Sequence, residues 1–123
     1  MLQAKNLIRL NASPDARRRR ALQRELKRWL PLLVENLRPE KIILFGSLAE
    51  ERVHEWSDID LVIVQRTDLP FLRRAREALL LLKPQVGVDL LIYTPGEFAQ
   101  LSKDRRFVRE EILDKGKVIY ERQ

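Results

Sequence analysis

Residues 41–64, with the sequence KIILFGSLAEERVHEWSDIDLVIV, decide how this chain folds. The stretch opens on a short apolar run, residues 42–45, which stops at Gly46-Ser47. After ten further residues, Asp58 and Asp60 open a second apolar run that ends at Val64. Runs of four to seven residues rich in Ile, Val and Phe, bounded by turn formers, are typical of buried strands. The stretch therefore predicts two β-strands.

Asp58 and Asp60 are two residues apart in the second predicted strand, so their side chains point to the same face. Two ionised carboxylates in a half-buried strand repel each other unless a cation neutralises them. Oxygen ligands of this kind suit Mg²⁺ or Mn²⁺, and Mg²⁺ held by carboxylates usually completes its shell with water and substrate phosphates. The pair therefore predicts a divalent metal site.

Gly46-Ser47 ends the first strand and is expected to open a short helix. Backbone N–H groups and the Ser47 hydroxyl would then lie at a helix N-terminus, a geometry that binds phosphate. A side chain at residue 46 would block the close approach of a triphosphate. The alternative interpretation is a tight strand-to-helix turn that binds no ligand.

The sequence after Val64 predicts a helix over residues 69–83 and a third strand over residues 86–93. Asp89 is the one charged residue in that strand, so it should have a cation beside it. Metal binding or proton transfer is one interpretation, and a structural salt bridge to an arginine is the other. The residues predicted to face the core from the helix are Leu72, Ala75, Leu79 and Leu82, with Arg73, Arg74 and Arg76 facing elsewhere.

The order of these segments also predicts the topology. Gly46 and Asp58 can share a ligand only if the first two strands run antiparallel as neighbours. The helix before the third strand permits a parallel crossover, which brings Asp89 beside Asp60. We therefore expect an α+β fold of two layers, with helices packed on a mixed sheet of three core strands and a short C-terminal strand at residues 117–120.

Gly-Ser, ten residues, Asp-x-Asp on a strand and a later acid between apolar residues together resemble the active-site motif of the nucleotidyltransferase superfamily that includes DNA polymerase beta. The size and the ending, FVREEILDKGKVIYER, are most similar to its minimal nucleotidyltransferase (MNT) family. The resemblance implies that Asp58, Asp60 and Asp89 are catalytic and hold two Mg²⁺ ions, with Mn²⁺ as an alternative. It also implies that Gly46 and Ser47 bind the triphosphate of ATP.

The loop after Gly46-Ser47 departs from the family pattern. Many MNT proteins carry Ala-Arg-Gly there, whereas this chain has Ala49 followed by Glu50, Glu51 and Arg52. Arg52, displaced by one or two positions, is the candidate replacement for the phosphate-binding arginine. Further along the loop, His54 is predicted to be a surface residue without a role. Trp56 is predicted to pack under the loop rather than to stack on a base.

The acceptor follows from the resemblance and from the length of the chain. Residues 1–123 are predicted to be a single minimal nucleotidyltransferase domain, with no room for a second domain to grip an acceptor. MNT proteins typically pair with a helical HEPN-type partner, often as the antitoxin of a toxin–antitoxin pair, and some adenylylate a tyrosine of that partner. The leading hypothesis is therefore transfer of AMP from ATP to a partner tyrosine. The alternatives are a degenerate antitoxin that acts by complex formation, and transfer to a small molecule or an RNA end.

Composition bounds the remaining possibilities. The chain has no cysteine, which excludes disulfides and thiolate metal sites, and no apolar stretch long enough to cross a bilayer. We therefore expect a cytoplasmic protein without a membrane partner. A net charge of +6 favours an anionic partner, with nucleic acid possible but not favoured.

An N-terminal helix is predicted to start at Ser13-Pro14 and to kink or break near Trp29, because Pro31 interrupts its apolar stripe. The run of four arginines at residues 17–20 spreads around this helix. A solvated face is the favoured interpretation, and contact with nucleic acid or an acidic partner is the alternative.

Overall fold

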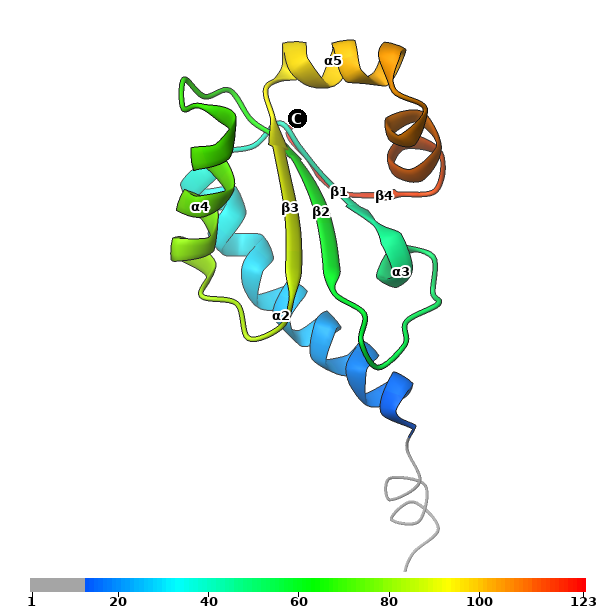
Figure 1. Cartoon of the computed structure of the whole chain (residues 1–123). Helices are drawn as coiled ribbons and strands as arrows, with labels where there is room; N and C mark the ends of the chain where they lie inside the picture. The colour runs from blue at the N-terminus through cyan, green and yellow to red at the C-terminus, as the bar shows by residue number, and fades with distance from the viewer. Residues whose placement is uncertain (1–12) are drawn as a thin grey trace, which may run out of the picture.

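Four strands form one mixed sheet in the computed structural model, which describes residues 13–123 (Figure 1). They are β1 (Lys41–Phe45), β2 (Ile59–Val64), β3 (Val88–Tyr93) and β4 (Lys117–Glu121), in the spatial order β3-β2-β1-β4. β1 runs antiparallel to β2 and β4, and β2 runs parallel to β3. The predicted α+β fold and mixed sheet are confirmed. The first twelve residues of the predicted domain lie outside the described part.

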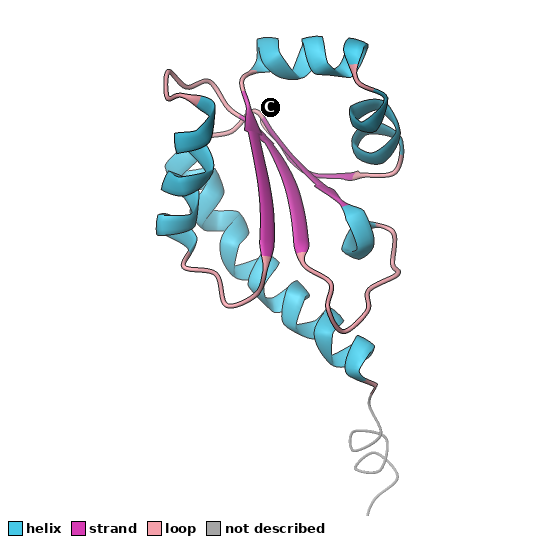
Figure 2. Cartoon of the chain, viewed as in Figure 1, coloured by secondary structure: helices cyan, strands magenta, loops and turns pink. Residues whose placement is uncertain are grey.

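Helices cover both faces of the sheet (Figure 2), so the fold has three layers where two were predicted. α2 (Pro14–Leu37) and α4 (Phe71–Leu82) pack against one face, while α5 (Pro95–Asp104) and the π-helix η1 (Val108–Asp114) pack against the other. The four-residue helix α3 (Gly46–Ala49) follows β1 directly. None of the helices within residues 13–123 combines the length and apolar composition that crossing a membrane requires.

α2 begins as the sequence predicts but does not break at Pro31. The Ser13 hydroxyl accepts a hydrogen bond from the Ala16 N–H, and Pro14 occupies the first turn. The helix then continues through Pro31 to Leu37, so the predicted break is wrong, and a kink within the helix stays a prediction. Pro31 is exposed, so the missing backbone hydrogen bond falls on the solvent side, while the buried Trp29 and Leu33 keep the helix packed on the sheet.

α4 presents only part of its predicted face to the core. Leu82 is buried and Ala75 packs against the core as predicted, whereas Leu72 is 84% exposed and Leu79 is also exposed. Ala78 and Arg74, which was predicted to face elsewhere, are buried. Helical spacing alone permits two different buried stripes on α4. It cannot show that the folded chain supplies hydrogen-bond acceptors for the guanidinium of Arg74. The stripe that is packed on the sheet is the one that includes Arg74.

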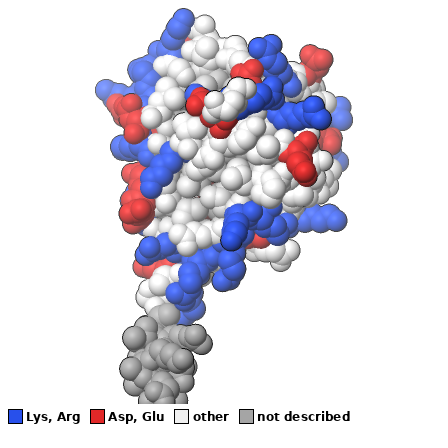
Figure 3. All heavy atoms as spheres, turned by 180° about the vertical axis from the view of Figure 1, so that it is seen from behind, with Lys and Arg blue, Asp and Glu red and all other residues white. Residues whose placement is uncertain are grey.

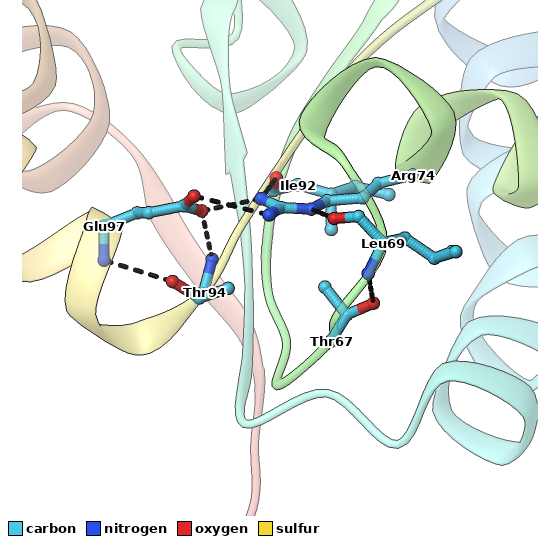
Figure 4. Close-up of polar contacts among 6 residues, drawn as sticks. All are labelled: Thr67, Leu69, Arg74, Ile92, Thr94 and Glu97. Carbon is cyan, nitrogen blue, oxygen red and sulfur yellow. Dashed lines mark hydrogen bonds and ion pairs between the residues drawn. The ribbon is translucent and has the colours of Figure 1, made fainter.

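Arg74 is buried because every side of its guanidinium has an acceptor (Figure 4). Its Nε donates to the Leu69 carbonyl at 2.9 Å and its Nη1 donates to the Ile92 carbonyl at 3.1 Å. The same Nη1 lies 2.6 Å from Glu97 Oε1, and Glu97 also forms a capping box with Thr94 at the start of α5. This network, the Arg74 clamp, fixes the starts of α4 and α5 to the carboxyl end of β3.

A second ion pair ties α2 to the segment that leads into β3. Both oxygens of the buried Glu25 accept hydrogen bonds from Arg28, at 2.8 and 2.9 Å. Glu25 Oε1 also accepts from the Gln85 N–H at 2.6 Å, and Arg28 donates to the Leu82 carbonyl at 2.9 Å. The hydrogen bonds from Arg28 and Gln85 hold the pKa of Glu25 at about 2, against an opposing effect of burial. The pair therefore stabilises the frame on which β3 is mounted.

Candidate active site

The three predicted acids gather where β1 ends and where β2 and β3 begin. Asp60 is the register partner of Asp89 across the parallel strands β2 and β3, as the sequence predicts. It is also the partner of Phe45, the last residue of β1. Asp58 directly precedes the first residue of β2, and alternation along the strands places all three on the face covered by α5 and η1.

Residue 46 must be glycine for two reasons: its backbone conformation and the space that the Asp60 carboxylate occupies. Its φ of +75° lies in the left-handed region, which favours glycine. A Cβ at this position would lie 2.2 Å from Asp60 Oδ2, far inside van der Waals contact. The structure thus gives Gly46 a reason that the sequence did not, which is room for a carboxylate of the protein itself. The predicted phosphate-binding roles of Gly46 and Ser47 stay predictions.

Asp58 is placed by two residues that the sequence reasoning missed. Its carboxylate lies over Gly87, where a Cβ would come within 2.2 Å of Asp58 Oδ1. Arg18, from α2, donates through Nε to the Ser57 carbonyl at 2.7 Å and places Nη2 3.4 Å from Asp58 Oδ1. One member of the arginine run thus binds within the chain instead of facing solvent alone. The residues in contact lie 40 positions apart, so no local pattern could have revealed them.

The electrostatics of the site show acids that repel one another. Burial, then the charges of Asp89 and Asp58, raise the pKa of Asp60 to about 6, and Arg52 opposes them. A cation bound to these oxygens would remove that repulsion, and an all-oxygen donor set suits Mg²⁺ or Mn²⁺. Within residues 13–123, no three acidic or histidine side chains are arranged to enclose a metal ion by themselves. Any ion would therefore take further ligands from water or substrate phosphates, and the metal-binding roles stay predictions.

The candidate phosphate-binding arginine already has a partner. Arg52 Nη2 lies 3.0 Å from Glu50 Oε2, and its hydrogen bond lowers the pKa of Glu50. Lys115, which follows η1, pairs with Glu111 at 3.0 Å. Glu111 and, to a smaller extent, the charge of Glu50 raise the pKa of Lys115. Arg52 and Lys115 are thus both engaged by acids, and Lys115 was not predicted for this corner. Binding of phosphate by Arg52 stays a prediction.

The loop before Asp58 points its tryptophan outward. Trp56 is 78% exposed, so its predicted packing under the loop is wrong. The turn is held instead by Ser57, whose hydroxyl accepts from the His54 N–H and whose N–H donates to the His54 carbonyl, and by His54 Nδ1, which accepts from the Trp56 N–H. These bonds bury Ser57 and leave the indole on the surface.

The profile of the family described as Polymerase beta, Nucleotidyltransferase matches residues 27–123, and the chain belongs to that family. This confirms the resemblance inferred from the Gly-Ser and Asp-x-Asp motifs. No curated protein matches the chain.

Two solved structures show the same fold. One is a candidate nucleotidyltransferase from Sulfolobus solfataricus, with a TM-score of 0.63 and 16% identity over 91% of each chain. The other is a toxin–antitoxin structure with AMP-PNP, with a TM-score of 0.50 and 21% identity over 82% of this chain and 74% of the other. At these identities the likeness establishes the fold and leaves substrate and partner open.

Proposed function

We propose that this chain transfers AMP from ATP to a hydroxyl of a protein partner, most simply a tyrosine, in a Mg²⁺-dependent reaction, and that it is the antitoxin of a toxin–antitoxin pair with a HEPN-type partner. The observation that carries the chemistry is the placement of Asp60 beside Asp89, opposite Gly46 at the end of β1. The likeness to a toxin–antitoxin structure with AMP-PNP supports ATP as the nucleotide and a protein as the partner.

The reaction exchanges one bond to the α-phosphorus for another. The acceptor oxygen forms a bond to that phosphorus, the bond to the bridging oxygen of the β-phosphate breaks, and pyrophosphate leaves. The acceptor also loses its proton. Bound Mg²⁺, or Mn²⁺ in its place, would neutralise the triphosphate and lower the pKa of the acceptor hydroxyl.

The residues of this chain would divide the work by position. Asp58 and Asp60 would hold the cations, because both carboxylates lie on one face at the start of β2. Asp89 would complete the second cation or take the acceptor proton, since it lies beside Asp60 on the edge strand of the sheet. Gly46 and Ser47 would receive the triphosphate, with Arg52 free to contribute if it releases Glu50.

One observation favours the degenerate antitoxin as a second candidate. Arg52 and Lys115 are already paired with acids, and Asp58 is in contact with Arg18. A site whose charges are satisfied internally binds a nucleotide less readily. In that case the chain would neutralise its partner by complex formation alone.

Intact mass separates these candidates. The chain is co-expressed with the protein encoded beside it, purified, and incubated with ATP and Mg²⁺. The proposal predicts that the partner gains the mass of AMP, and that an Asp89→Asn variant adds none. A stable complex without any adduct would favour the degenerate antitoxin. AMP transfer to RNA or to a small molecule without the partner would contradict the choice of a protein acceptor.

A further inference from the structure

The sheet face that carries the acids is covered unevenly. Val62 and Val64 on β2 point to this face and are buried by α5 and η1. Leu91 and Tyr93 on β3, which share the face with Asp89, are only partly buried. The β3 half of this face is therefore less completely covered than the β2 half.

A groove of about 430 Å³ lies on this half. Figure 1 shows the elements around it, where α4 begins and α5 crosses the end of β3. We call it the β3 groove, and it is lined by Phe71, Tyr93, Glu97, Gln100 and Leu101. Its aromatic rings are ordered by stacking: the Phe71 and Tyr93 centroids are 5.5 Å apart with an interplanar angle of 21°, and Phe98 continues the stack beyond Tyr93 at 6.3 Å.

The β3 groove is rigid because the Arg74 clamp forms its frame. Arg74 ties the start of α4, which carries Phe71, to Glu97 on α5, and its guanidinium lies 5.7 Å from the centroid of the Phe71 ring. Both sides of the groove are thus fixed to β3 before any ligand binds. A preformed groove loses little conformational entropy when it is occupied.

We propose that the β3 groove is the docking site for the acceptor, and that the acceptor is an apolar, aromatic-bearing segment of a protein, because the groove is apolar, contains no cation in its lining and lies on the same face of β3 as Asp89. This inference rests on the proposed function and assigns the surface by which its acceptor is recognised.

The charge of the lining selects against nucleic acid. Its one ionised group is Glu97, an acid already engaged by Arg74, so a polyanion would find no counter-charge there. The basic side chains gather instead toward the N-terminal part of α2, seen from behind (Figure 3), where Arg19 and Arg20 are exposed. An RNA would bind that surface rather than the β3 groove.

Length supports a peptide as the occupant. Asp89 and Tyr93 are four residues apart on one strand, which corresponds to about 13 Å. An extended segment of about four residues spans that distance, so apolar side chains could occupy the β3 groove while a hydroxyl reaches Asp89. Burial, then Asp89 and Glu97, raise the pKa of Tyr93, which agrees with both carboxylates facing this strip.

The test is an NMR titration of the full ¹⁵N-labelled chain with defined probes. They are a synthetic peptide with one tyrosine flanked by leucine and phenylalanine, the same peptide with lysine and glutamate flanks, and a short RNA. The apolar peptide should shift the amide signals of Tyr93, Gln100 and Leu101. RNA shifts confined to α2 would agree with the proposal, whereas shifts of the groove signals by RNA, or by both peptides equally, would overturn it.

Two variants and a matched control complete the experiment. Phe71→Asp places a charge in the β3 groove, and Gln100→Trp fills it from an exposed position on α5 without touching the core. Each should weaken the apolar peptide by about tenfold. Leu72→Asp, the same charge on the neighbouring exposed residue outside the groove, should bind as the wild type does.

Binding and transfer are read separately, so failure of this inference differs from failure of the proposed function. If Phe71→Asp and Gln100→Trp bind the peptide as the wild type does, the docking site is wrong even where AMP transfer is seen. If the peptide binds in the β3 groove and no acceptor ever gains AMP, the proposed function is wrong and the docking site stands. A matched loss of folding in Phe71→Asp would leave Gln100→Trp to decide.

Discussion

The two ends of the paired strands β2 and β3 treat charge in opposite ways. At the carboxyl end of β3, the buried Arg74 has acceptors on every side, and its hydrogen bond holds the pKa of Glu97 below the usual value. At the amino end, Asp60 and Asp89 lie side by side and the pKa of Asp60 is raised. At the carboxyl end, the charged groups pair with each other and hold α4 and α5 on β3. The other end is left with excess negative charge, which is where a cation or a cationic ligand is expected to bind.

The largest effect should come from removing charge at the unsatisfied end. Asp60→Asn should reduce AMP transfer by about a thousandfold, because it removes a carboxylate on which cation binding depends. The same change should raise the free energy of unfolding at pH 7 by about 1 to 2 kcal/mol, since it removes the repulsion that raises the pKa of Asp60.

Intact mass and urea unfolding measure the two quantities. Asp68→Asn, an exposed change in the loop between β2 and α4, is the control and should alter neither. An Asp60→Asn protein that transfers AMP at the wild-type rate would show that the acids do not form the site.

At the carboxyl end of β3, a substitution should mainly lower the stability of the fold. Arg74→Met keeps an apolar stem but leaves Glu97 and the Leu69 and Ile92 carbonyls without their donor. The free energy of unfolding should fall by about 3 kcal/mol, measured by urea denaturation. Arg76→Met on the exposed side of the same helix should change it by less than about 0.5 kcal/mol. Equal effects of the two changes would mean that the Arg74 clamp does not stabilise the fold.

A smaller effect on stability is expected from the glycine that makes room for Asp60. Gly46→Ala forces a Cβ against Asp60 Oδ2 at a left-handed φ, so it should lower the free energy of unfolding by about 2 kcal/mol and also impair transfer. Gly96→Ala, whose Cβ would meet no atom within 4 Å, should leave stability unchanged or slightly higher. Thermal unfolding of both variants checks this. Equal stability of the two variants would contradict the close contact between Gly46 and Asp60.

The free energy of unfolding should fall at acid pH, because the Glu25 carboxylate stabilises the fold only while it is ionised. Glu25 has its pKa lowered from 4.5 to about 2, so its contribution is full above pH 4.5 and is lost as the pH falls toward 2. The wild type should lose about 2 kcal/mol of this contribution over that interval. A Glu25→Gln variant should be less stable at pH 7 and show a flatter acid slope in urea denaturation. An unchanged slope would mean that Glu25 is not held ionised by Arg28.

The sequence predicted the parts of the molecule that depend on local patterns. The strands, the Gly46 turn and the pairing of Asp60 with Asp89 follow from alternation, turn formers and a crossover of fixed direction. The buried Arg74 did not, because periodicity cannot show that Ile92 and Glu97 supply its acceptors. Arg18 and Gly87 were also missed, since each touches Asp58 only through the folded chain.

Crystals grown with Mn²⁺ and a non-hydrolysable ATP analogue test the central claim most directly. Anomalous scattering locates manganese independently of the protein. The account predicts manganese bound to Asp58 and Asp60, with Asp89 beside a second ion and the triphosphate against Gly46. Manganese bound elsewhere, with Asp58 still paired to Arg18 and no metal at Asp60 or Asp89, would contradict it.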